Sequence, residues 1–128
     1  MTGTVFIVGP LLLSMFFGGV LLLTDAELWT VAPSHAYVLI VFTILDGVFA
    51  AVVWKGWSKA ADVGIVWGAG KFALFLGDIL TAPEFGLTYA EFASYLFSLW
   101  GYNGLLASQA LIAFGSYYAK KRQATTRS

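Results

Sequence analysis

Apolar residues in this chain gather into four long runs that are separated by shorter, more polar segments. Each run is about as long as the roughly 20 residues with which a helix crosses the hydrocarbon core of a membrane. The first run contains no ionisable side chain. The pattern predicts an all-α, polytopic integral membrane protein, a four-transmembrane-helix bundle with short loops in a single domain, residues 1–128. The predicted spans cover residues 4–23, 35–54, 59–80 and 92–119.

The segments between the runs carry signals for additional short elements. Thr24 and Glu27 have the spacing of a capping box, which predicts a short helix at the membrane surface. Thr88 and Glu91 repeat this spacing just before the fourth run. The fourth run is longer than the hydrocarbon thickness requires, so it must tilt or project beyond the bilayer. The basic tail that follows it, residues 120–128, is expected to be disordered.

The composition supports a membrane protein and excludes several other classes. Hydrophobic residues make up 59% of the chain and charged residues 11%, and the mean hydropathy is +0.82. A soluble domain carries about 25% charged residues, so this chain has too few to cover a water-exposed surface. No basic patch of the size that nucleic-acid binding requires is present, so nucleic acid is not an expected partner. The chain has no cysteine, which excludes disulfides, thiolate metal sites and cysteine nucleophiles.

The charged residues outside the runs sort by side when the chain is threaded through four spans. Lys55 and Lys59 lie between the second and third spans, and the basic tail follows the fourth, so all of them fall on one side. Four acidic residues fall in the loops on the other side: Asp25, Glu27, Glu84 and Glu91. Because basic loops mark the cytoplasmic face, we expect a cell-membrane protein with both termini in the cytoplasm.

The third run carries charges at membrane depth. Lys71 lies near its middle, where a charge facing lipid costs about 2.5–3.5 kcal/mol, so this lysine needs a partner. Successive spacings of four, three, four and three place five residues on one stripe of a helix: Gly64, Gly68, Lys71, Phe75 and Asp78. Gly64 and Gly68 allow another backbone to approach closely. The charged stripe is therefore predicted to be a helix-packing face.

Asp46 is the one acidic residue inside the second run, and it is the expected partner of Lys71. With a rise of about 1.5 Å per residue, the two side chains reach similar depths in antiparallel helices. We therefore expect a buried Asp46–Lys71 ion pair, with Asn103 or Gln109 of the fourth span beside it. Three interpretations remain open: a structural pair that fixes helix register, a proton or ion relay through Asp46, and a contact of one charge with another subunit.

The same stripe ends in Asp78, whose alternative partners are Lys71 and His35. His35, Asp78 and Glu84 are weak candidates for metal ligands, since carboxylates and imidazole bind hard cations, copper or zinc. Their spacing matches no ligand motif, and acidic loops are usually only solvated. No metal site and no cofactor is predicted, because a single histidine also cannot supply two axial ligands to a haem. A bound lipid is compatible with the composition.

No motif for catalysis stands out in the chain. It contains neither a glycine-rich phosphate loop nor a serine in a G-x-S-x-G turn. The leading functional hypothesis is therefore a small, non-catalytic integral subunit that packs against a larger membrane complex, for example a respiratory or oxygenase assembly. Its partners would be the lipid bilayer and other integral membrane subunits. The alternatives are a small oligomeric transporter or ion conductor that uses Asp46 and Lys71, and an enzyme with an outward-facing site.

Overall fold

The computed structural model describes residues 3–127, and the side chains of residues 3–124. About 90% of the chain is helical and the described residues contain no strand, as the sequence predicts. In chain order the elements are α1 (Thr4–Thr24), α2 (Ala26–Val31), α3 (Pro33–Trp54), α4 (Ala60–Gly77), the 3-10 helix η1 (Asp78–Phe85), α5 (Tyr89–Ser98) and α6 (Trp100–Arg127).

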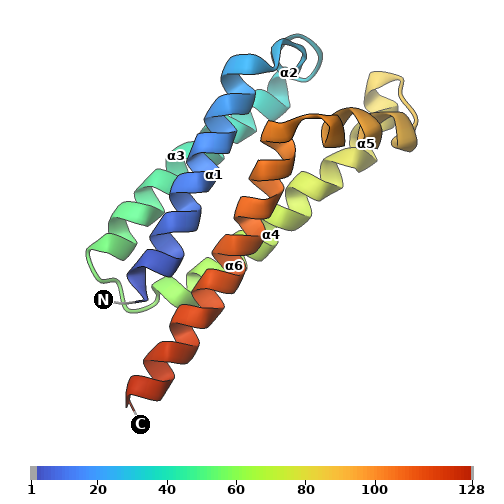
Figure 1. The fold of residues 1–128 in the computed structure, drawn as a ribbon. Helices are drawn as coiled ribbons and strands as arrows, with labels where there is room; N and C mark the ends of the chain where they lie inside the picture. Colours follow the sequence, from blue (N-terminus) through green and yellow to red (C-terminus); the bar gives the residue numbers. More distant parts are fainter. Residues whose placement is uncertain (1–2, 128) are drawn as a thin grey trace.

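The four long helices α1, α3, α4 and α6 form an elongated bundle, and the short elements α2, η1 and α5 gather at one end of it (Figure 1). Helix α1 packs along α3 on one side and along α6 on the other, and α6 packs along α4. Helices α3 and α4 approach each other much less closely along their lengths. The bundle therefore has an open side between α3 and α4.

Glycines produce the close helix contacts on which this packing depends. A Cβ atom at Gly68 of α4 would lie 2.6 Å from the backbone nitrogen of Ala113 in α6, and one at Gly115 would lie 2.0 Å from the carbonyl oxygen of Phe6 in α1. Gly64 of α4 faces Ser116 of α6 in the same way. Any larger residue at these positions would push the helices apart, so the glycines set the spacing of α1, α4 and α6.

Three helical segments are long and apolar enough to cross a membrane, and they indicate a membrane protein: α1, α3 and the continuous run Ala60–Phe85 of α4 and η1. At most about a third of each apolar stretch is buried inside the molecule, so most of its surface faces outward. Helix α6 is not among these three candidates. Its outer turns carry Lys120, Lys121 and Arg122, and its bundle-facing side carries buried Ser108 and Gln109.

The predicted fourth span, residues 92–119, is not a single helix. The backbone of Leu99 is extended (φ −88°, ψ 116°), and this residue separates α5 from α6. At the other end α6 continues to Arg127, so the prediction of a disordered tail is wrong for residues 120–127, and Ser128 lies outside the described residues. An ion pair between Lys120 Nζ and Asp62 Oδ1 of α4, at 2.7 Å, joins these outer turns of α6 to the bundle.

One of the two predicted capping boxes is present. The backbone N–H of Glu91 donates to Thr88 Oγ1 at 3.1 Å, and the backbone N–H of Thr88 donates to Glu91 Oε1 at 3.0 Å. The predicted short helix after α1 also exists, but the Thr24–Glu27 box does not form. Thr24 Oγ1 instead donates to the carbonyl of Val20 at 2.6 Å, because α1 extends through Thr24 and leaves Asp25 to precede α2.

Candidate functional site

A layer of polar side chains crosses the middle of the bundle, with one contribution from each long helix. Asp46 comes from α3, Lys71 from α4, Ser14 from α1 and Gln109 from α6, and each is at most 2% exposed. Lys71 Nζ donates to Asp46 Oδ1, so the two residues form the buried ion pair that the sequence predicts. The layer joins helices that are far apart in the chain.

The Asp46 carboxylate accepts hydrogen bonds from three side chains. In addition to Lys71, Ser14 Oγ donates to Oδ2 at 2.6 Å, and Trp67 Nε1 donates to Oδ1 at 2.8 Å. Trp67 lies one helical turn before Lys71 in α4, so the two residues reach the carboxylate from the same face of one helix. Three donors compensate the carboxylate for much of the hydration that it loses on burial.

Lys71 and Gln109 complete the layer. The Lys71 ammonium lies 4.8 Å from the centre of the Trp67 ring, within range of a cation–π interaction, and 3.5 Å from Ser14 Oγ. Gln109 Nε2 donates to Ser14 Oγ at 2.8 Å and to the Leu105 carbonyl at 3.0 Å. Gln109 Oε1 is buried without a hydrogen-bond partner among the described residues. Ser14 thus connects the ion pair to α6.

Hydrophobic clusters enclose this polar layer on both sides. One cluster includes Leu11, Ala50 and Ile112, and the other includes Leu39, Phe75 and Leu106. Along each long helix the polar residue lies between a member of the first cluster and a member of the second. A charge pair in such a setting is costly to break, because the remaining partner would be left unpaired away from water. Chemically, the arrangement is suited to fixing the relative register of four helices.

The structure places the other predicted polar residues outside this layer. Asn103 was expected beside the pair, but it is exposed and its Nδ2 donates to the Phe97 carbonyl at 2.8 Å. The break at Leu99 explains this correction, because it places Asn103 in the first turn of α6, beside the end of α5. Asp78 is also remote from the pair, and its neighbouring charged group is His35.

Neither Ser14 nor Trp67 is among the predicted partners of the ion pair, although the sequence contains a signal for each. Ser14 is the only hydroxyl residue between residues 5 and 23, so a lone polar group inside an otherwise apolar span pointed to an interior position. Trp67 precedes Lys71 by four residues, the spacing at which side chains on a helix meet. Its indole N–H requires an acceptor when it lies away from water, and Asp46 supplies one.

A cavity of about 360 Å³ is lined by residues of α2, η1 and α5 together with the adjoining ends of the long helices. His35 and Asp78 both line it, whereas Glu84, the third weak metal candidate, is exposed and does not. Among residues 3–124 no group of three or more histidine and acidic side chains has the geometry to hold a metal ion. No residue of the polar layer lines the cavity, so the cavity and the polar layer are separate features.

Comparison with known protein families, with curated proteins and with solved structures gives no match.

Proposed function

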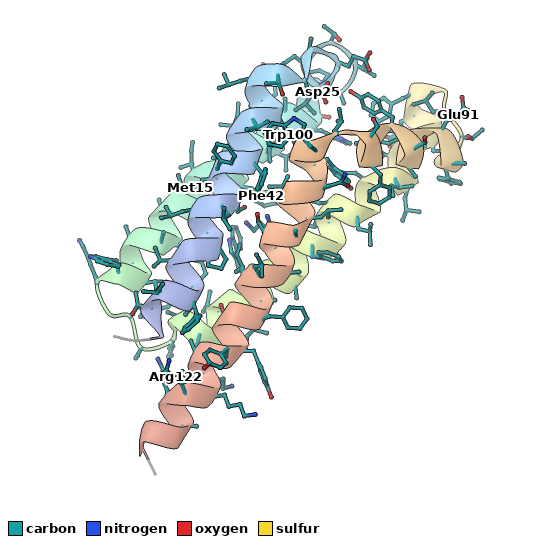
Figure 2. All side chains as sticks on the ribbon, viewed as in Figure 1. Met15, Asp25, Phe42, Glu91, Trp100 and Arg122 are labelled. Carbon is teal, nitrogen blue, oxygen red and sulfur yellow. The ribbon has the colours of Figure 1, made fainter. Side chains whose placement is uncertain are left out.

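We propose that this protein is a small, non-catalytic integral membrane subunit that packs against a larger membrane complex. In this proposal all four long helices cross the membrane, α6 included, and both termini lie on the cytoplasmic side. Charge distribution supports the orientation: Asp25 and Glu91 lie at one end of the molecule and Arg122 at the opposite end (Figure 2). Basic residues are favoured on the cytoplasmic side of a membrane.

The main support for the proposal is the outward surface of α4 at the open side of the bundle, which no other described part of the chain covers. A Cβ atom at Gly70 or Gly77 would have no neighbour within 4 Å, whereas one at Gly68 would meet the α6 backbone. Gly70 and Val66 also line a shallow groove whose other wall includes Phe42 of α3. Small residues at helix surfaces let a second transmembrane helix approach closely, so this groove is suited to a helix of another subunit.

The polar layer supports a structural role over the alternative of an ion conductor. A relay through Asp46 would need this carboxylate to exchange protons or ions with a path across the membrane. Asp46 and Lys71 are instead almost fully buried and hydrogen-bonded to residues of their own chain, between two hydrophobic clusters. The pair therefore holds the scaffold that presents the groove, and transport through it is the weaker hypothesis.

Extraction from the native membrane in a mild, non-ionic detergent tests the proposal. We expect larger, cofactor-bearing membrane subunits to travel with the protein in stoichiometric amounts through size-exclusion chromatography, identified by mass spectrometry. The variants Gly70→Leu and Gly77→Leu should remain helical and monodisperse but should lose these partners, because the added side chains would fill the surface that a partner helix approaches.

Gly19→Leu is the matched control, since Gly19 in α1 also has open space around its missing Cβ atom but lies away from the α3–α4 groove. This variant should retain the partners. A native protein that runs alone or only as a homo-oligomer would overturn the proposed function.

A further inference from the structure

The 360 Å³ cavity at the α2 and α5 end of the bundle has the size of a small-molecule site. Its deep walls are apolar and come from elements across the whole chain, including Leu21, Leu39, Phe75, Phe92, Leu96 and Leu105. Aromatic rings meet at one wall: the Phe85 ring lies 5.7 Å from the ring of His35 and 5.6 Å from the ring of Phe92. The cavity could therefore enclose an apolar or aromatic body.

The charged residues that line this cavity are mainly acidic. Four of the seven acidic residues of the chain contribute to it: Asp25, Glu27, Asp78 and Glu91. His35 is the single basic side chain on its wall, and among the described side chains no lysine or arginine lines it. Asp25 and Glu91 come from different segments of the chain and lie at the same end of the molecule (Figure 2). The charge of the wall favours a cation.

The other carboxylates of the wall already have partners within the chain, and Asp78 is the exception among them. Tyr95 Oη donates to Asp25 Oδ1 at 2.8 Å, Tyr102 Oη donates to the Phe75 carbonyl, and Glu91 belongs to the capping box of α5. The Asp78 carboxylate accepts no hydrogen bond from any described residue, and the titratable groups near it are the His35 imidazole and the Tyr102 phenol. It is the carboxylate that remains available to a ligand.

The phenol of Tyr95 lies beside two of the carboxylates that line the cavity. Burial, and in addition the neighbouring carboxylates of Asp25 and Glu27, raise the pKa of this phenol. The smaller part of this shift, which comes from the two carboxylates, agrees with the acidic lining of the wall.

We propose that the cavity binds a small organic ammonium ion with an apolar or aromatic body. The Asp78 carboxylate would pair with the ammonium group, and the aromatic rings of Phe75, Phe85 and Phe92 would surround it, since ring faces attract cations. The leucine side chains of the walls would enclose the apolar body. This inference is independent of the proposed partner subunit, because the cavity is built from this chain alone.

Isothermal titration calorimetry on the purified full chain in dodecyl maltoside tests the inference, with benzyltrimethylammonium as the cation and benzyl alcohol as its neutral counterpart. We expect the cation to bind at least tenfold more tightly than the alcohol. Asp78→Asn, which keeps the shape of the side chain, should weaken cation binding about tenfold and leave the alcohol unaffected. Leu96→Trp, which fills the cavity, should abolish binding of the cation.

Asp62→Asn is the matched control, because Asp62 is an exposed carboxylate paired with Lys120 and does not line the cavity. Its cation affinity should equal that of the native chain. Equal affinity for the cation and the alcohol, no measurable cation binding, or unchanged binding in Asp78→Asn would overturn the inference. If Asp78→Asn fails to fold, unchanged cation binding in Leu96→Trp would do so as well. None of these results would affect the proposed subunit function, which depends on co-purification.

Discussion

At the scale of single residues, two ion pairs in this chain show how the environment of a charge pair determines its contribution to the stability of the fold. Asp46 and Lys71 are buried and share hydrogen bonds with neighbouring side chains, whereas both Asp62 and Lys120 are more than half exposed. Water screens the exposed pair, so it contributes little to stability. Breaking the buried pair leaves a charge without a partner in an apolar interior, which costs far more.

We expect Asp46→Asn and Lys71→Met each to lower the free energy of unfolding by about 3–5 kcal/mol, because each change leaves one buried group unpaired. The double variant should recover much of this loss, since it removes both charges together. Unfolding in mixed micelles at increasing SDS fraction, followed by tryptophan fluorescence, measures all three. Lys120→Met is the matched control and should unfold close to the native chain.

Two outcomes would count against a structural pair. A fully stable single variant would show that the pair does not hold the helices together. A well-folded Asp46→Asn protein that loses proton or ion flux in liposomes, with no recovery in the double variant, would favour the relay instead.

Some contacts of the polar layer could be predicted from the sequence and others could not. The pairing of Asp46 with Lys71 could be predicted, because a single acid in one apolar run and a central lysine in the next leave few other partners at the same depth. The choice of Gln109 over Asn103 could not, since both lie in the fourth run and the choice depends on where that run breaks. The break at Leu99 places Asn103 beside the end of α5, whereas Gln109 reaches the ion pair through Ser14.

At the scale of elements, the first three long helices follow the apolar runs closely, because a loop with charged or turn-forming residues ends each run. The α5–α6 boundary was missed because residues 92–119 contain neither proline nor a charge that would mark a break. Helix α5 is distinct because it packs with η1 and lines the cavity. Such tertiary contacts leave no local signal in the sequence.

Helix α5 should unwind at its start when Glu91 is protonated. The backbone N–H and then the side chain of Thr88 lower the pKa of the Glu91 carboxyl below its usual value, which is about 4.3–4.5. A lowered folded-state pKa stabilises the helix above the unfolded pKa, and the stabilisation is lost as the pH falls through the folded value. We expect the amide protection factors of α5 to fall between about pH 6 and pH 3, as measured by hydrogen exchange.

Glu91→Gln is the control for this experiment, because its amide can still accept the bond from the Thr88 N–H but cannot titrate. Its α5 protection factors should not change over the same pH range. Native α5 protection that is equally independent of pH would contradict a stabilising role for the Glu91 carboxylate.

At the scale of the whole molecule, the sequence predicted an all-helical chain of long apolar helices but not their spatial order. Which helices become neighbours depends on glycine contacts such as Gly68 with α6 and Gly115 with α1. Such a contact can be identified only when the facing helix is known. The cavity at the α5 end was also not predictable, since it requires the Leu99 break and the fold of η1 together.

Cysteine labelling tests the proposed orientation, and the native chain offers a clean background because it contains no cysteine. In intact cells a membrane-impermeant maleimide should label Glu84→Cys, which lies in the exposed end of η1, and should not label Ser58→Cys between α3 and α4. Gln123→Cys should also stay unlabelled until the cells are lysed, if α6 crosses the membrane. Labelling of Gln123→Cys in intact cells, with Ser58→Cys protected, would leave three spans.

The Asp46–Lys71 pair also has a consequence for biosynthesis. On the proposed topology, α3 is made before α4, so Asp46 reaches the bilayer before the lysine that neutralises it has been translated. Each helix alone would carry a charge that costs about 2.5–3.5 kcal/mol at the membrane centre. The short connection of residues 55–59 keeps the two helices together. We therefore expect α3 and α4 to leave the translocon as one hairpin, already paired, with Gln109 arriving last to complete the polar layer.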